Sequence, residues 1–122
     1  MFFDVNAMSG YSAPSPNSRH AKLIFDQHTI KDAPMSMALF RFAPGQTGPA
    51  HHHDTEVEVY YCMQGEGSVM LDEIEHRLTP HTVLYIPPGK THETKNTSSE
   101  DFVFLAIFSP ALDLDFIRNW NT

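Results

Sequence analysis

Hydrophobic residues in this chain gather in short runs that are rich in Val, Ile, Phe and Tyr. Turn-forming sequences such as APG at 43–45 and PPG at 87–89 separate these runs. Short β-branched and aromatic runs between turns are typical of β-strands. The predicted strands are Ala21–Asp26, Met35–Phe42, Val57–Met63, Ser68–Leu71, Glu75–Leu78, Val83–Ile86 and Phe102–Phe108. Because helical periodicity is nearly absent, we predict an all-β sandwich or barrel.

The two ends of the chain depart from this pattern. Residues 1–20 include a stretch rich in Ser, Pro and Gly, so we predict an irregular N-terminal arm there. Residues 21–122 are predicted to form a single domain, because a chain of 122 residues supports one core. We also expect a short C-terminal helix within Ala111–Trp120, since Pro110 suits a first helical turn and the apolar residues recur at helical spacing.

Composition and charge narrow the class of partner. Fifteen acidic residues against eight basic ones give a formal net charge of −7, and the basic residues are scattered. Nucleic acids and anionic membranes are bound by basic patches, so neither is an expected partner. The single cysteine, Cys62, cannot form an internal disulfide, and residues 1–10 lack the basic and apolar regions of a secretory signal. No apolar stretch is long enough for a membrane helix, so we predict a cytoplasmic protein.

Strand alternation predicts which of the chemically reactive side chains converge. Glu58 and Tyr60 are two residues apart in a predicted strand and therefore share a face. In an extended segment His51 and His53 also share a face, while His52 points the opposite way. His51, His53 and Glu58 can therefore converge on one point, where imidazole and carboxylate groups would suit a divalent metal ion.

Two segments of the sequence resemble the two motifs of the cupin superfamily. Residues 45–65 fit the pattern G-x5-H-x-H-x4-E-x6-G, and residues 87–96 fit P-x-G-x2-H-x3-N. The matching positions are Gly45, His51, His53, Glu58, Gly65, Pro87, Gly89, His92 and Asn96. One position departs from the family, because His81 stands where the second motif usually begins with Gly.

The resemblance implies a double-stranded β-helix, a jelly-roll barrel, with one divalent metal ion held inside it. The metal ligands that it implies are His51, His53, Glu58 and His92. Nitrogen and oxygen ligands are compatible with Fe, Mn, Ni, Zn or Co, so the identity of the metal stays open. Open positions on such an ion would accept a small-molecule substrate or O₂.

The roles of some neighbouring residues are open. Tyr60 could act as an acid, a base or a hydrogen-bond donor towards a metal-bound substrate, or it could be a core residue. Glu56 shares the face of Glu58, although the spacing and the cupin resemblance both favour Glu58 as the ligand. His52 is expected on the surface, and His81 is either a turn residue or part of a pocket rim.

Cupins carry out several reactions, so three hypotheses about function stay open. The main one is a non-haem Fe(II) oxygenase acting on a small oxygen-bearing organic molecule, because the candidate pocket residues are mostly apolar. The alternative is a lyase or isomerase that uses the metal as a Lewis acid. The third is a non-catalytic module that binds a metal or a small ligand. A sugar phosphate is disfavoured, because the motif regions offer only Arg41, Lys90 and Lys95 as cations.

The strand predicted over Phe102–Phe108 is apolar on both faces. A barrel interior covers only one of them, so the other face needs the C-terminal tail or a second subunit to exclude water. We therefore predict a homodimer in which the N-terminal arm or this strand crosses the interface.

Overall fold

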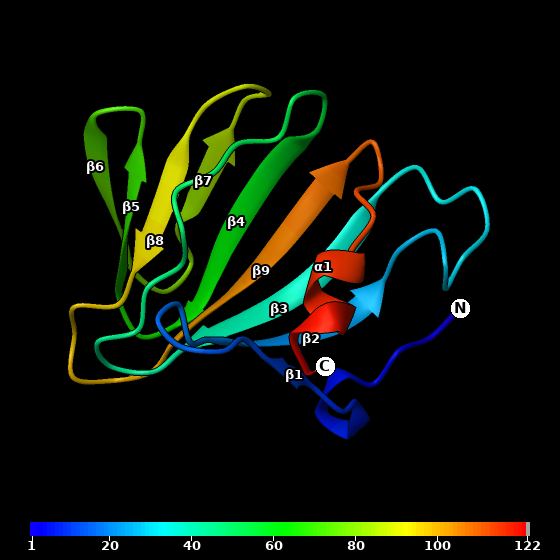
Figure 1. Ribbon diagram of the computed structural model, residues 1–122, viewed down its shortest axis with the longest axis horizontal. Helices are drawn as coiled ribbons and strands as arrows, with labels where there is room; N and C mark the ends of the chain where they lie inside the picture. Colours follow the sequence, from blue (N-terminus) through cyan, green and yellow to red (C-terminus); the bar gives the residue numbers. More distant parts are fainter. Residues whose placement is uncertain (122) are drawn as a thin grey trace.

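The computed structural model describes residues 1–121, and two antiparallel β-sheets dominate it (Figure 1). The larger sheet has six strands in the order β1-β2-β3-β9-β4-β7, and the smaller has three in the order β6-β5-β8. The strands are β1 (Tyr11–Ser12), β2 (His20–Phe25), β3 (Ser36–Phe42), β4 (Val57–Gln64), β5 (Gly67–Leu71), β6 (Ile74–Leu78), β7 (Val83–Ile86), β8 (His92–Lys95) and β9 (Phe102–Ser109). The helical elements are η1 (Val5–Ala7), α1 (Asp115–Arg118) and η2 (Asn119–Asn121). The sheets form a double-stranded β-helix, which confirms the predicted all-β jelly-roll class.

The predicted strands coincide with β2 to β7 and β9, and their ends shift by a single residue at most. Strand β8 is absent from the predicted set because its sequence, HETK, is polar rather than apolar. Its side chains nevertheless alternate, with His92 and Thr94 buried. Strand β1 lies inside the segment predicted as an irregular arm, where Tyr11 pairs with Ala21 of β2. The domain boundary at residue 21 stays a prediction.

Aromatic rings fill the space between the sheets. On β9, Phe102, Phe104 and Phe108 point inward and are almost completely buried. Phe40 and Phe42 of β3 pack against Phe104 with ring centroids 5.5 and 5.8 Å away. Burying each such ring contributes about 1.5–3 kcal/mol relative to leaving it exposed. The same rings give the interior of the barrel an apolar wall.

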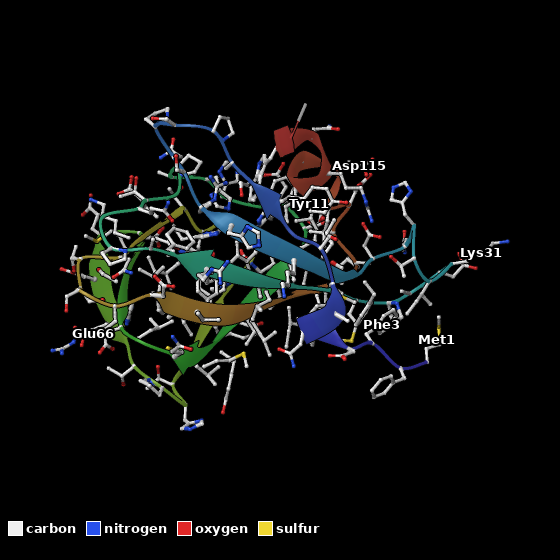
Figure 2. All side chains as sticks on the ribbon, turned by 90° about the horizontal axis from the view of Figure 1, so that it is seen from below. Met1, Phe3, Tyr11, Lys31, Glu66 and Asp115 are labelled. Carbon is white, nitrogen blue, oxygen red and sulfur yellow. The ribbon has the colours of Figure 1, made fainter. Side chains whose placement is uncertain are left out.

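The second apolar face of β9 lies on the outside of the larger sheet. Both edges of β9 are paired, with β3 on one side and β4 on the other, so only its outward side chains remain to be covered. The N-terminal segment covers part of this face, where Phe3 stacks on Phe25 at 5.9 Å. Figure 2 shows Phe3 and helix α1, marked by Asp115, on opposite faces of the sheet. An apolar groove of about 450 Å³ remains beside Phe3 and Leu105, and the homodimer stays a prediction.

The C-terminal helix is shorter than the sequence predicts. Helix α1 begins at Asp115, well after Pro110, so the prediction that Pro110 occupies its first turn is wrong. The reason lies in the backbone before the helix, whose N–H groups bond to core side chains. Leu112 N donates to Ser36 Oγ at 3.0 Å, and Leu114 N donates to Asp26 Oδ2 at 3.3 Å. Every helix in residues 1–121 falls short of the length and apolar character that a membrane span requires.

A buried ion pair anchors the tail to the barrel. Asp26 is fully buried, and its two carboxylate oxygens accept bonds from Arg118 Nη1 at 2.7 Å and Nη2 at 2.9 Å. Burial alone would raise the pKa of Asp26, but the Arg118 guanidinium outweighs it and lowers this pKa from 3.8 to about 2. The folded protein therefore favours the charged carboxylate more than the unfolded chain does. This preference links the stability of the fold to pH.

We expect Asp26→Asn to lower the free energy of unfolding by about 2 kcal/mol at neutral pH, since each pKa unit is worth 1.36 kcal/mol. The contribution of a depressed carboxyl pKa is present above pH 4 and is lost as pH falls towards 2. The difference in free energy of unfolding between wild type and Asp26→Asn should therefore be roughly half as large at pH 3 as at pH 7. Urea unfolding at pH 7 and pH 3 measures both values. Asp115→Asn is the matched control, because Asp115 also contacts Arg118 (2.8 Å) but is half-exposed, and it should cost less than about 1 kcal/mol. If the two variants lose the same free energy of unfolding, the Asp26–Arg118 pair does not anchor the tail.

Candidate metal centre

Backbone pairing brings the two histidine motifs together. His51 N donates to His92 O at 3.0 Å, and His92 N donates to His51 O at 2.8 Å. Residues paired in this way on antiparallel segments project their side chains from the same face. The two imidazole rings accordingly lie 4.3 Å apart between centroids. Further along, Gly89 N donates to His53 O at 2.7 Å, so the pairing continues past the third histidine.

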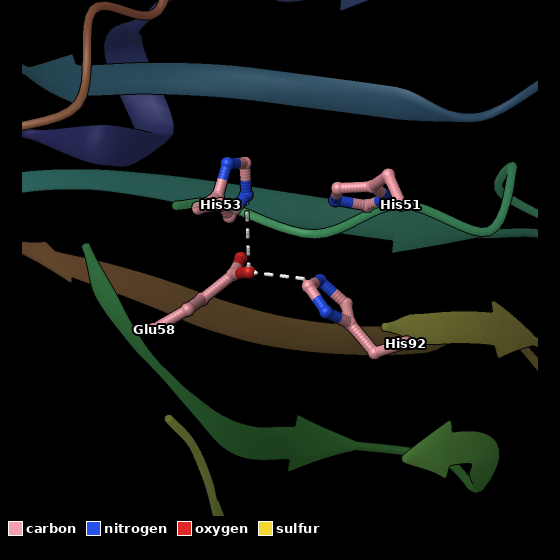
Figure 3. A group of neighbouring side chains, drawn as sticks. All are labelled: His51, His53, Glu58 and His92. Atoms are coloured by element: carbon pink, nitrogen blue, oxygen red, sulfur yellow. Dashed lines mark ion pairs between the residues drawn. The ribbon is translucent and has the colours of Figure 1, made fainter. Parts of the chain in front are cut away.

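Four side chains converge where the two segments meet (Figure 3). Glu58 comes from β4, His92 from β8, and His51 and His53 from the segment that precedes β4. Each offers one ligand atom, and these atoms all lie within 4.8 Å of one another. Glu58 Oε1 is 3.0 Å from Nε2 of His92 and 3.5 Å from Nε2 of His53. The sequence predicts this group of four, and the structure brings it together.

Hydrogen bonds on the far side of two rings set their orientation. His51 Nδ1 lies 2.9 Å from Pro49 O, and His92 Nδ1 lies 3.2 Å from Lys90 O. A carbonyl oxygen only accepts, so each Nδ1 carries the proton and donates it. Nε2 of a neutral ring is then left with a lone pair that faces the cluster. Carbonyl partners of this kind are typical of metal-binding histidines.

Three buried atoms of the cluster lack a hydrogen-bond partner among the described residues. They are His53 Nε2, Glu58 Oε1 and His92 Nε2. Nε2 of His92 and of His53 lie 3.0 and 3.5 Å from Glu58 Oε1, but none of these contacts counts as a hydrogen bond. Buried polar atoms are nearly always satisfied, so a group of three calls for a partner. A cation at their common centre would satisfy all three, and the donor set of three imidazoles and one carboxylate fits a divalent metal.

Electrostatics keeps the carboxylate charged in spite of its burial. Burial disfavours the charged form of Glu58, but its contacts with His53 and His92 outweigh this and lower its pKa. Burial also opposes protonation of His92, yet the neighbouring Glu58 carboxylate raises the pKa of this ring. At His51 burial dominates and lowers the pKa, which favours the neutral ring. An ionised carboxylate beside imidazole rings is the state that binds a metal cation.

A narrow chamber inside the barrel reaches the four side chains. Its free volume is about 30 Å³, which is room for about two water molecules. A wider vestibule of about 180 Å³ adjoins it and shares His51, His53 and Phe116 with it. The inner wall is formed largely by Phe40, Phe42, Phe104 and Phe108. Only a small group at the end of a substrate can therefore enter the chamber.

Tyr60 lies on the same face of β4 as Glu58, as the alternation predicts. It is 4% exposed and lines the chamber together with Thr94 and Glu58. Burial, with the Glu58 charge as the next cause, raises the pKa of Tyr60 well above its usual value. The phenol is therefore neutral and can donate a hydrogen bond towards the site. A catalytic role for Tyr60 stays a prediction.

The residues with open roles lie outside the cluster. His52 is exposed and its Nε2 lies 3.1 Å from Asp54 Oδ1, as expected for a surface residue. Glu56 accepts a hydrogen bond from Thr55 and does not join the four ligand atoms. His81 occupies a turn with φ of 70°, a conformation that glycine adopts more easily, which explains why the family usually has Gly there.

Sequence patterns did not mark every residue that lines the chamber and the vestibule. Arg19 lines both, although it lies in the segment predicted as an irregular arm. Phe116 of α1 also lines both, and it is 41% exposed. No motif or spacing distinguishes these two residues, because they reach the site only through the path of the chain. The cations considered from the sequence, Arg41, Lys90 and Lys95, line neither space.

Comparisons with known proteins agree with the architecture. A family model described as Cupin domain matches residues 38–108, which contain both histidine motifs. The chain is 34% identical over 107 residues to the glucose-6-phosphate isomerase of Thermococcus onnurineus (strain NA1), covering 74% of this chain and 57% of that protein. It is 33% identical over 103 residues to auxin-binding protein 1 of Arabidopsis thaliana, covering 76% of this chain and 50% of that protein. The chain thus spans about half the length of these curated relatives.

Solved structures show the same fold. A predicted oxalate decarboxylase from Thermotoga maritima has a TM-score of 0.82 at 19% identity, covering 90% of this chain and 99% of that one. KdgF from Halomonas sp. has a TM-score of 0.80 at 21% identity, covering 95% of this chain and 97% of that one. At these identities the likeness concerns the fold alone.

The cluster predicts which substitutions remove metal binding. We expect His53→Ala and Glu58→Gln each to weaken Mn²⁺ or Zn²⁺ affinity by more than about 100-fold, because loss of a direct ligand exceeds the 10–100-fold cost of losing an outer partner. His52→Ala is the matched control, since His52 is adjacent but faces away, and its affinity should equal that of wild type. Competition with a fluorescent chelator measures affinity, and circular dichroism checks the fold. Equal affinities for His52→Ala and His53→Ala would rule out this ligand set.

Proposed function

Since the chain belongs to the cupin family, whose domain model spans residues 38–108, we propose that it is a metal-dependent lyase or isomerase. Its substrate would be a small organic molecule with oxygen atoms that can ligate a metal. The observation that carries the proposal is the cluster of His51, His53, Glu58 and His92, whose ligand atoms converge. Three of these atoms, on His53, Glu58 and His92, are buried without a hydrogen-bond partner among the described residues. A divalent ion bound there supplies a Lewis acid that polarises a carbonyl or carboxylate group.

The residues around the cluster would prepare a substrate for proton transfer. The chamber admits only the reacting end of a molecule, and its phenylalanine walls exclude bulk water from that end. Tyr60, a buried neutral phenol next to Glu58, would hold or deliver a proton at its hydroxyl oxygen. Proton movement beside a polarised carbonyl is the chemistry that lyases and isomerases share.

The main hypothesis drawn from the sequence is an oxygenase. Similarity to the glucose-6-phosphate isomerase of T. onnurineus supports an isomerase or lyase more than this oxygenase. None of the relatives named above is described as an oxygenase. Because the chain spans about half of the curated relatives, their whole activity does not transfer to it. We therefore propose only the class of reaction, a proton transfer that does not use O₂.

A binding module is the second candidate, and one observation favours it. The chain is 33% identical over 103 residues to a protein named as auxin-binding, which shows that the similarity extends beyond proteins named as enzymes. The small free volume of the chamber also suits a ligand that is held rather than transformed. Binding of a small acid by metal-loaded protein without any conversion or proton exchange would select this candidate.

We expect metal-loaded protein to exchange a C–H proton of a suitable substrate for deuterium, or to convert that substrate, equally fast under argon and under air. Small 2-hydroxy acids, 2-keto acids and aldoses in D₂O, followed by ¹H NMR, form the test panel. Removal of the metal with a chelator should abolish the reaction. Conversion that requires air would contradict the proposal and support the oxygenase hypothesis instead.

Tyr60→Phe should slow this exchange by about 10²–10⁴-fold, the usual contribution of a positioned acid or base, without changing metal content. Tyr61→Phe is the matched control, because Tyr61 faces the other side of β4 and contacts His81 (2.7 Å) instead of the chamber. The rate of this control should equal that of wild type. Equal rates for wild type and Tyr60→Phe would remove Tyr60 from the mechanism.

A further inference from the structure

Arg19 is a cation at the mouth of the candidate metal centre. It is half-buried and lines both the inner chamber and the vestibule, together with His51 and His53. Its side chain passes over Gly48, where an added Cβ would lie 3.6 Å from Nε and 3.7 Å from Cδ. The guanidinium charge also acts on Tyr60, which lies deeper in the chamber. Arg19 is thus close to the site and on the path by which a ligand reaches it.

The guanidinium is held in place but is not neutralised. Nη1 donates to Asn17 O at 2.7 Å, and the guanidinium carbon lies 4.5 Å from the centroid of the Trp120 ring. No other hydrogen bond from this guanidinium, and no carboxylate within 4.0 Å of it, is present in residues 1–121. Arg77 and Arg118, in contrast, each pair with a carboxylate. Arg19 therefore keeps most of its five N–H donors available.

A partly desolvated cation without a counter-ion is an unfavourable arrangement in a folded protein. Burial lowers the pKa of Arg19, which reports this cost, although arginine stays protonated at neutral pH. An anionic ligand group would compensate it, and guanidinium groups bind carboxylates through paired hydrogen bonds. Stacking on Trp120 and the bond to Asn17 limit the motion of the side chain, so little entropy is lost on binding.

We propose that Arg19 binds a carboxylate of the substrate while the opposite, oxygen-bearing end of the same molecule reaches the four-residue cluster. The proposal rests on the function proposed above and names its substrate class, a small organic acid. A carboxylate suits the site better than a phosphate, because Arg19 is the one Lys or Arg side chain of residues 1–121 that lines the chamber or the vestibule. Arg19 would thus be a specificity-determining residue.

Three hydroxy acids with the same chelating end test this proposal. Malate has a distal carboxylate, 2-hydroxybutyrate has a methyl group there, and 3-phosphoglycerate has a distal phosphate. Their dissociation constants are measured by calorimetry on Mn²⁺-loaded protein whose metal content is determined separately. The variants are Arg19→Met, Arg19→Lys and the control Arg41→Met. Arg41 is exposed on β3 and lines neither space, so the control should match wild type.

We expect wild type to bind malate at least about tenfold more tightly than 2-hydroxybutyrate, as a charge-assisted pair allows. Arg19→Met should remove this preference and leave 2-hydroxybutyrate affinity unchanged, while Arg19→Lys should retain part of it. Circular dichroism and an unchanged metal content show that the variants are folded.

Other results overturn the proposal in distinguishable ways. If wild type binds 2-hydroxybutyrate and malate equally, or if Arg19→Met keeps the preference, Arg19 does not recognise the carboxylate and the metal site stands. Tighter binding of 3-phosphoglycerate than of malate would replace the carboxylate with a phosphate. If metal-loaded wild type binds none of the three acids, the small-acid substrate class is wrong. Absence of bound metal would instead refute the function on which the proposal rests.

Discussion

The backbone pairing of His51 with His92 is the constraint on which the site depends, because it joins segments separated by forty residues of chain. Two reciprocal hydrogen bonds place the imidazoles on one face, and the adjoining bond from Gly89 to His53 continues the alignment. Antiparallel geometry then leaves little freedom in where the rings lie. Glu58 reaches the same point from β4 of the larger sheet, whereas His92 lies on β8 of the smaller sheet. The cluster therefore forms only when the two sheets are closed on each other.

Closure places polar atoms in an apolar interior, and the rest of the barrel offsets that cost. The phenylalanines of β3 and β9 provide the apolar burial, while small residues such as Ala38 and Ala106 leave room for the rings. Within residues 1–121, the buried side-chain nitrogen and oxygen atoms without a hydrogen-bond partner are those of His53, Glu58 and His92. Strain of this kind is characteristic of functional sites, where a bound cation or ligand completes the polar contacts.

The entrance to the site comes from the parts of the chain that carry no motif. Arg19 arrives from the loop between β1 and β2, and Phe116 arrives from the helix that the Asp26–Arg118 pair holds against the barrel. Trp120 joins these two parts by stacking on the Arg19 guanidinium. In the proposed function, metal binding and ligand selection would therefore be separated in this molecule. The paired motifs would provide the first, and the ends of the chain would provide the second.

The sequence determined seven of the nine strands of residues 1–121 and the identity of the four cluster residues, because strands follow from short-range alternation and the four residues match the spacing of a motif. Alternation at two-residue spacing placed Glu58 and Tyr60 on one face, and the spacing of His51, His53, Glu58 and His92 matched a known motif. Tertiary structure alone decided the start of α1, the turn at His81 and the position of Arg19. Each of these depends on a partner distant in sequence: Asp26 for the tail, Cys62 for the turn and Trp120 for the arginine. Local patterns cannot encode such partners, since they arise only when the chain has closed into the barrel.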